Sequence, residues 1–349
     1  MSTWELLAEL PLQIEAYTLE PRQAVVSSDF ERKSTVIRLT GAGSEGLGED
    51  VTYDAVDQEI LQQAGPTLPL AGSFTIESFA ERLAELALFP APPQREVSER
   101  YRRWAYESAA LDLALGQAGT TLHELLGREP RPVRFVVSLR LGEPPSMEPV
   151  SSRLERYPTL RFKLDPTSSW DETLIAELVA TGAVDSVDFK GLYVGSVVDQ
   201  PADPLLYARV AEAFPHAWIE DPALTEETDA VLAAHRERFS WDASIHSIED
   251  IEALPYPPRM VNIKPSRLGG LRNLLDAYDY CAERGIGNYG GGQFELGVGR
   301  SQNQYLASLF HGDAPNDVAP TGFNLPETPV DLPTSPLAPA PSAQGFRWG

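Results

Sequence analysis

Two hydrophobic patterns divide the chain near residue 130. Before that point, apolar and polar residues alternate at 12–17, and residues 34–40 are rich in β-branched side chains, a combination that predicts antiparallel strands. The Gly-Leu-Gly-Glu segment at 46–49 predicts a turn into a third strand. Helical patterns follow at 76–88 and 98–116. Strands followed by helices predict an α+β unit over the first 130 residues.

From residue 131 onward, short apolar runs alternate with helical segments. The runs predict strands at 133–139, 160–164, 183–189, 217–220, 239–242, 260–264, 286–291 and 316–319. Strands separated by helices pair in parallel through right-handed crossovers, and eight of them predict a closed α/β barrel over residues 131–320. Residues 321–349 are dense in proline and alanine, so we expect an extended tail that packs back on the amino-terminal unit.

Charged residues stand at the ends of five of these runs: Lys163, Asp188, Glu220, Asp242 and Lys264. The steps between them are 25, 32, 22 and 22 residues, each about the length of one strand–helix unit. The carboxyl ends of parallel strands are where an α/β barrel carries its active site. Three carboxylates between two lysines are suited to one divalent cation and two acid/base groups.

This ordered set of residues resembles the enolase superfamily, and within it the muconate lactonizing enzyme subgroup. The matching segments are Tyr106-Glu-Ser-Ala-Ala-Leu-Asp112, Arg161-Phe-Lys163, Glu220-Asp221-Pro222 and Ile263-Lys-Pro-Ser-Arg-Leu-Gly-Gly270. The resemblance implies an amino-terminal α+β capping domain on a modified TIM barrel, (β/α)7β. It also implies Mg²⁺, with Mn²⁺ as an expected substitute, held by Asp188, Glu220 and Asp242. Residues 27–31 and 49–53 match the loops that close over the barrel in relatives.

The reaction implied by the resemblance is removal of a proton α to a carboxylate, with Lys163 and Lys264 as the acid/base pair. A hard cation stabilises the enediolate that results, and burial brings the pKa of a lysine toward neutrality. Lysines on the second and sixth strands are expected on opposite faces of a substrate. Racemisation or epimerisation, cycloisomerisation and succinylbenzoate-synthase-type dehydration remain open as outcomes.

Lys190 departs from this resemblance, since most relatives carry asparagine two residues after the third-strand aspartate. A cation so close to Asp188 would compete electrostatically with a metal, pair with another acid or contact the substrate. The further candidates for substrate contact or for tuning the site are Arg161, Asn262, Gln293 and Glu295. A packing role for the arginine and a helix-capping role for the last two remain open.

Two alternative functions remain open. A sugar-acid dehydratase of the same superfamily normally uses a histidine on the sixth or seventh strand, and none of the five histidines falls at those strand ends. A non-catalytic barrel acting as a binding or scaffold protein is favoured by Lys190. It is disfavoured by the matched pair Lys163 and Lys264, which a scaffold does not need. Fold alone does not decide between them.

Composition narrows the partners and the compartment. The chain has 28 basic and 51 acidic residues, a net charge of −23, so a nucleic-acid partner is not expected. Cys281 is the only cysteine, which points to a reducing compartment, and no apolar run is long enough for a membrane helix. We therefore expect a cytoplasmic protein, and the resemblance implies that it acts on a small carboxylate. The resemblance also implies a symmetric homo-oligomer.

Overall fold

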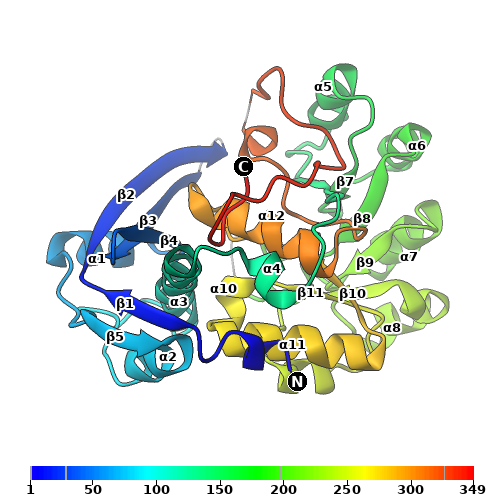
Figure 1. Cartoon of the computed structure of the whole chain (residues 1–349). Coiled ribbons are helices and arrows are strands. Elements are labelled where there is room, and N and C mark those ends of the chain that lie inside the picture. The colour runs from blue at the N-terminus through cyan, green and yellow to red at the C-terminus, as the bar shows by residue number, and fades with distance from the viewer. Residues whose placement is uncertain (1, 28–29, 196–197, 326) are drawn as a thin grey trace.

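The computed structural model describes residues 2–27, 30–195, 198–325 and 327–349. They form an antiparallel sheet with its helices, followed by a curved parallel sheet surrounded by helices (Figure 1). This is the predicted fold class, an α/β modified TIM barrel with an amino-terminal α+β capping unit. Within the described residues, no helix is long and apolar enough to cross a membrane.

The amino-terminal unit is built on a three-stranded antiparallel sheet. Its strands are β2 (Ala16–Ser27), β3 (Phe30–Gly41) and β4 (Ser44–Asp50), in that order. A second antiparallel pair consists of β1 (Pro11–Ile14) and β5 (Gly72–Thr75). The helices of this unit are η1 (Trp4–Leu6), α1 (Ala55–Ala64), α2 (Ile76–Ala84), α3 (Ser98–Ala118) and α4 (Leu122–Leu126).

The predicted turn at 46–49 is wrong, because these residues belong to strand β4. The turn lies just before the strand, where Ala42 and Gly43 have φ angles of 48° and 76°. A Cβ atom on Gly46 would lie 2.2 Å from the carbonyl oxygen of Ala109 in α3. A Cβ atom on Gly48 would approach the backbone of the same helix equally closely. The two glycines therefore let α3 lie directly on the sheet.

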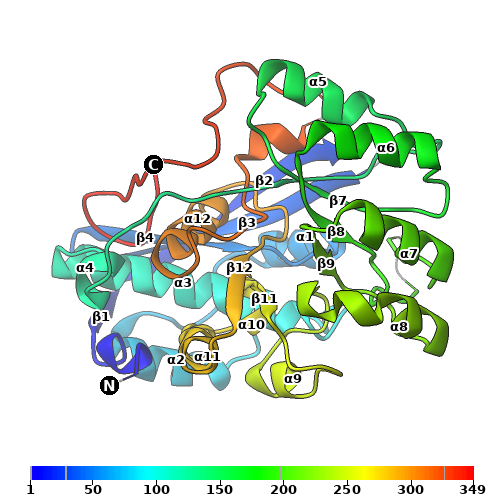
Figure 2. The ribbon, with the colours of Figure 1, turned by 90° about the vertical axis from the view of Figure 1, so that its right-hand side faces the viewer.

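Within the described part of the chain, seven parallel strands form the curved sheet, and each hydrogen-bonds to the next. They are β6 (Val137–Leu139), β7 (Phe162–Leu164), β8 (Val184–Asp188), β9 (Trp218–Glu220), β10 (Phe239–Trp241), β11 (Met260–Ile263) and β12 (Gly287–Gly290). Helices cover the outer face, as Figure 2 shows for α5 to α8. The helices of this unit are α5 (Glu148–Arg156), α6 (Glu172–Thr181), α7 (Pro204–Ala213), α8 (Glu226–Leu232), η2 (Ala233–Arg238), α9 (Ile248–Glu252), α10 (Pro265–Leu268), α11 (Leu271–Arg284), α12 (Val298–Phe310) and η3 (Thr321–Asn324).

The eighth predicted strand, 316–319, is not a regular strand. It is reduced to two isolated parallel bridges, Phe135 to Asn316 and Gly291 to Asp317, which join it to both ends of the seven-stranded sheet. The side chain of Asn316 takes over part of the ladder: its Oδ1 accepts from the backbone N–H of Gly290 at 2.7 Å. A side-chain amide thus supplies contacts that strand pairing would otherwise make.

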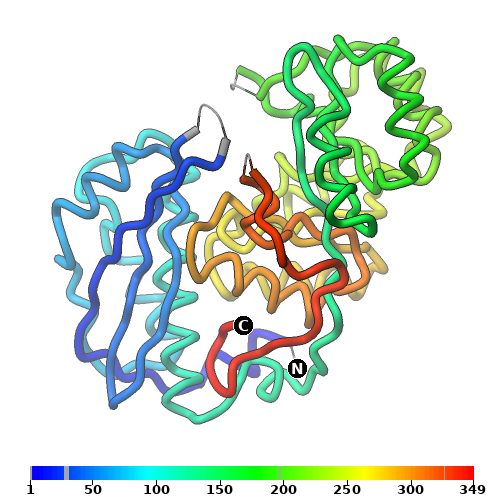
Figure 3. The backbone as a smooth tube through the Cα atoms, turned by 90° about the horizontal axis from the view of Figure 1, so that it is seen from above, coloured from blue at the N-terminus to red at the C-terminus, as the bar shows by residue number. Residues whose placement is uncertain are grey.

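The proline-rich tail runs over the surface and ends between the two units (Figure 3). Phe346 is fully buried, and its ring lies edge-on to Trp104 of α3 with centroids 6.4 Å apart. Arg347 forms an ion pair with Asp112 of the same helix at 2.7 Å. The tail therefore contacts the amino-terminal unit through an aromatic anchor and a buried carboxylate.

Candidate active site

The five charged residues predicted at strand ends form an arc along the parallel sheet. Lys163 lies on β7, Asp188 and Glu220 end β8 and β9, and Asp242 and Lys264 directly follow β10 and β11. All five side chains are buried. Their neighbours on the strands are buried apolar residues of the core: Phe162, Leu164, Val187, Ile219, Trp241, Val261 and Ile263. The alternation of a strand sends these apolar residues to one face and the charged residues to the other.

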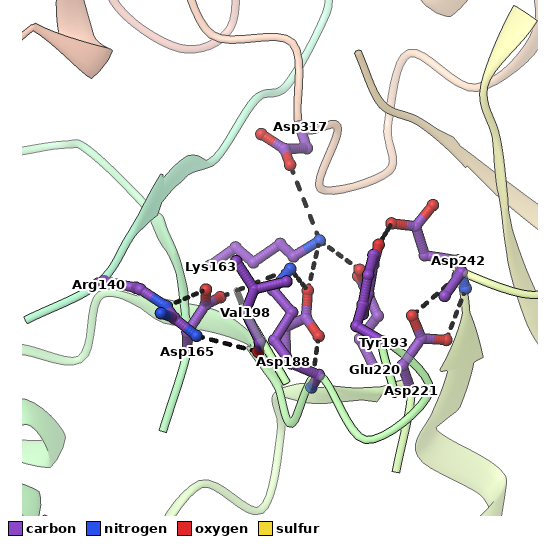
Figure 4. Close-up of polar contacts among 12 residues, drawn as sticks. Arg140, Lys163, Asp165, Asp188, Tyr193, Val198, Glu220, Asp221, Asp242 and Asp317 are labelled. Carbon is purple, nitrogen blue, oxygen red and sulfur yellow. Dashed lines mark hydrogen bonds and ion pairs between the residues drawn. The ribbon is translucent and has the colours of Figure 1, made fainter. Parts of the chain in front are cut away.

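Lys163 stands at one end of the arc and binds two of the carboxylates. Its Nζ lies 3.1 Å from Asp188, hydrogen-bonds to Glu220, and is 3.7 Å from Asp317 (Figure 4). Burial opposes the charged form of this amine, but the carboxylates of Glu220 and Asp188 outweigh it and raise the pKa of Lys163 well above its ordinary value. Burial likewise raises the pKa of Glu220 well above its usual range, although the charge of Lys163 opposes that shift. The pKa values of both members of this buried pair are therefore raised.

Lys264 stands at the other end and has a different environment. Its Nζ donates to Asp242 at 2.8 Å, while Arg267 binds the other oxygen of that carboxylate at 2.7 Å. Burial lowers the pKa of Lys264, and the positive charge of Arg267 adds to that effect against the attraction of Asp242. The two lysines therefore differ in how firmly each holds its proton.

Three carboxylates are close enough to share one cation. Oxygen atoms of Asp188, Glu220 and Asp221 lie within 4.8 Å of one another, and all three residues are buried. A set of buried carboxylate oxygens fits a hard divalent cation such as Mg²⁺ or Mn²⁺. Asp221 differs from the other two, because its oxygens accept from the backbone N–H groups of Asp242 and Ala243 at 2.9 and 2.8 Å.

Asp242, the third ligand implied by the sequence resemblance, is held by side chains. Besides Lys264 and Arg267, the hydroxyl of Tyr193 donates to it at 2.9 Å. Although burial raises the pKa of this carboxyl, the charges of Arg267 and Lys264 hold it well below its usual range. Its role as a ligand remains a prediction, and Asp221 is the neighbouring alternative that the geometry adds.

Tyr289 is a member of the cluster that sequence reasoning missed. It lies on β12, and its hydroxyl donates to Glu220 at 2.5 Å. A lone aromatic residue among glycines was the available signal, because a buried tyrosine hydroxyl usually finds a polar partner. Asp165 and Arg267 were also missed, since their roles depend on side chains reaching across neighbouring strands.

Among the remaining candidates, Arg161 and Asn262 occupy contrasting positions. Arg161 hydrogen-bonds to Asp185 and to the carbonyl of Gly182, so the structure does not bring it into the carboxylate cluster. Asn262 is fully buried on β11, and neither polar atom of its side chain has a hydrogen-bond partner among the described residues. A Cβ atom on Gly291 would lie 2.7 Å from both this amide and the Lys264 side chain. An unpaired amide beside a lysine of the arc is suited to a substrate contact.

Gln293 and Glu295 lie between the barrel and the amino-terminal unit. The backbone N–H of Gln293 and the amide of Asn303 both donate to Glu295, and Arg300 is 3.2 Å from its other oxygen. The carbonyl of Gln293 accepts from Arg32 of β3 at 3.1 Å. The contact with Arg32 makes Gln293 part of the junction between the two units, whereas Glu295 is held by residues of the barrel unit. The predicted closing loop at 27–31 lies partly outside the described residues.

The overall architecture is that of known enolase-superfamily structures. The chain is similar to a dipeptide epimerase from Enterococcus faecalis V583, with a TM-score of 0.71 and 18% identity over 97% of this chain and 100% of the other. It is also similar to a muconate cycloisomerase from Pseudomonas fluorescens, with a TM-score of 0.63 and 18% identity over 97% and 95%. At these identities the likeness shows the fold, which is that of enolase-superfamily structures.

Sequence comparison also finds similarity to enzymes. The chain is 28% identical to an o-succinylbenzoate synthase of Geobacillus stearothermophilus over 83% of its own length and 78% of the relative. It is 27% identical to an N-succinylamino acid racemase of Thermus thermophilus over 90% and 84%. The chain belongs to the family described as domain of unknown function DUF8230, whose N-terminal domain matches residues 5–125 and whose C-terminal domain matches residues 129–325.

Proposed function

We propose that this protein is a divalent-metal-dependent enzyme that removes a proton α to a carboxylate, and that its reaction is dehydration of the o-succinylbenzoate synthase type. The observation that carries the proposal is the arc of three buried carboxylates with a buried lysine at each end. The relatives that are 26–29% identical include synthases of this kind. The α-proton and a hydroxyl on the neighbouring carbon leave together as water.

The proposed metal ligands are Asp188, Glu220 and Asp242. They lie on three consecutive strands, so one cation can bind across neighbouring strand ends. A divalent cation bound there would supply stabilisation of the negative charge that develops on the substrate carboxylate. Carboxylate oxygens of Asp188 and Glu220 lie close enough to share a hard cation, together with Asp221. Asp242 enters the proposed set from the sequence resemblance.

The proposed proton carriers are Lys163 and Lys264, which act at their Nζ atoms. Three strands separate β7 from β11 in the sheet, and these strands carry the three carboxylates. A substrate carboxylate placed over those carboxylates would have one lysine on each side of its α carbon. The exposed fractions of the two lysines are 2% and 7%, so water is largely excluded from both amines.

Racemisation of an N-succinylamino acid is the second candidate reaction. A lysine at each end of the arc favours it, because one amine can remove the α-proton while the other returns a proton to the opposite face. Dehydration requires only one of the two amines to act as the base. If replacement of one of the two lysines abolishes α-proton exchange and replacement of the other does not, dehydration is therefore favoured.

Exchange of the α-proton tests the proposal. The protein with Mn²⁺ is incubated in D₂O with N-succinylamino acids, and loss of the α-proton signal is followed by NMR; formation of o-succinylbenzoate from its hydroxy-acid precursor is followed separately. We expect catalysis of at least one of these reactions, with chelator abolishing it. Absence of both across the panel, with metal present, would count against the proposed function.

A further inference from the structure

Lys190 is placed between two buried carboxylates that belong to different strands. Its Nζ hydrogen-bonds to Asp188, and it lies 3.8 Å from Oδ1 of Asp165, the residue that follows β7. That Oδ1 atom has no hydrogen-bond partner among the described residues, although Arg140 binds the other oxygen at 3.4 Å. Asp165 therefore offers the same ammonium group a second acceptor whose Oδ1 is still available for a hydrogen bond.

The backbone holds Lys190 in this position. Its φ angle is 54°, in the left-handed region that a lysine rarely adopts. The conformation is held by its own N–H, which donates to Oδ1 of Asp188 at 3.0 Å, and by the next N–H, which donates to the carbonyl of Asp221 at 3.0 Å. The ammonium is thus directed to a proposed metal ligand by a local turn rather than by chance packing.

The distribution of lysines along the chain also supports a specific role for Lys190. Of the 28 basic residues, only Lys33, Lys163, Lys190 and Lys264 are lysines, and the remaining 24 are arginines. Three of these four lysines bind the carboxylates of one buried cluster. A compact ammonium on a flexible stem can move between two acceptors more readily than a planar guanidinium.

We propose that Lys190 is an internal cation that competes with the divalent metal for Asp188, and that metal binding transfers its ammonium from Asp188 to Asp165. This inference rests on the proposed metal site and assigns that site a built-in limit on affinity. Asp165 then acts as the acceptor that receives the displaced charge.

Manganese affinity measured on the full-length protein tests this transfer. Free Mn²⁺ is followed by EPR at constant pH during titration of the wild type, K190M, D165N and the double variant. K33M serves as the lysine control, because Lys33 pairs with Glu59 at the surface of the amino-terminal unit. Loss of a like charge beside the ligand is expected to tighten Mn²⁺ binding by about tenfold or more in K190M. K190Q provides a second neutral variant if K190M folds poorly.

The effect of D165N separates a transfer from simple electrostatics. If Asp165 receives the ammonium, D165N weakens Mn²⁺ binding in the wild type and has no effect in the K190M background. An equal weakening in both backgrounds would overturn the transfer. Unchanged affinity in both K190M and K190Q, with wild type binding normally, would overturn the competition while leaving the proposed function intact. Absence of binding in wild type and in every variant would overturn the metal site itself.

Discussion

At the scale of single residues, the chemistry depends on two amines in unequal surroundings. Lys163 faces two carboxylates, whereas Lys264 shares its single carboxylate with Arg267. A lysine serves as a base only when it can release its proton near working pH. Carboxylates raise the pKa of Lys163, whereas burial lowers the pKa of Lys264, so Lys264 releases its proton more readily than Lys163 does.

Replacing either lysine tests its proposed role as an acid or a base. We expect K163M and K264M to lose α-proton exchange by about 10²–10⁴-fold, the contribution of a general acid or base, on at least one substrate of the panel. K33M should exchange at the wild-type rate, since Lys33 lies outside the arc. Wild-type exchange in both K163M and K264M would contradict the assignment of the lysine pair.

The third metal ligand can be decided between two neighbouring aspartates. Asp242 is held by the side chains of Lys264 and Arg267, which can shift, whereas Asp221 is held by two backbone N–H groups. We expect D242N to weaken Mn²⁺ binding by about 100-fold or more, because a carboxylate is lost from the ligand set. Isothermal titration of D242N and D221N makes the comparison. Retained binding in D242N with loss in D221N would instead identify Asp221 as the ligand.

At the scale of helices and strands, a buried carboxyl joins the two units. Glu107 on α3 accepts from the backbone N–H of Leu271 at the start of α11, at 2.7 Å. Burial raises the pKa of this carboxyl from 4.5 to about 7, against the lowering effect of the hydrogen bond. The folded protein consequently binds a proton here over a pH range in which the unfolded chain has released it.

The pH dependence of stability should reveal this carboxyl. Because its pKa is raised on folding, its contribution to the free energy of unfolding falls as pH rises from 4.5 to about 7, by about 2–3 kcal/mol. E107Q keeps an acceptor oxygen for Leu271 and should remove that slope. Urea unfolding of wild type and E107Q at several pH values measures the difference, with E177Q on the exposed face of α6 as the control. Parallel pH profiles for wild type and E107Q would refute the expectation.

The elements were predictable where hydrophobic periodicity was strong. The predicted strands 160–164, 183–189 and 217–220 are confirmed as β7, β8 and β9, because each is a short apolar run with a charged residue at or near its end. The helix α5 and the small strand β5 were not predicted, since their apolar residues form no long periodic run. The prediction of an eighth strand was wrong because the side chain of Asn316 makes hydrogen bonds that strand pairing would otherwise make. The prediction of a turn at 46–49 was wrong because the glycines of that segment allow close contact with α3.

The sequence could predict which charged residues lie at the strand ends, but it could not predict the partners of their side chains. Spacing alone marked Lys163, Asp188, Glu220, Asp242 and Lys264 as strand-end residues. The partners of those groups lie far away in sequence: Tyr289 reaches Glu220 across 69 positions, and Asp165 meets Lys190 from the neighbouring strand. Such pairings depend on the three-dimensional reach of side chains, which hydrophobic periodicity does not encode.

At the scale of the whole molecule, the dominant feature is negative charge. The net charge is −23, and three of the four lysines are engaged in the buried site. Self-repulsion between surface carboxylates destabilises a compact chain, and dissolved salt screens it over about 10 Å at 0.1 M.

Added salt should therefore stabilise the protein. We expect the thermal midpoint to rise by several degrees between about 0.02 and 0.3 M KCl, a range in which screening of exposed charges becomes effective. Differential scanning calorimetry at fixed pH measures the shift, and an equal osmolality of a neutral solute provides the control. A midpoint that stays constant or falls with KCl would show that self-repulsion does not limit stability.

The central claim is that the carboxylate arc holds a divalent cation between two lysines. A crystal soaked in Mn²⁺ and examined by anomalous scattering tests it most directly. The account predicts a peak about 2.0–2.3 Å from oxygen atoms of Asp188, Glu220 and Asp242, with the Lys190 ammonium moved to Asp165. A crystal without such a peak, with the Lys190 ammonium still bound to Asp188, would contradict the account.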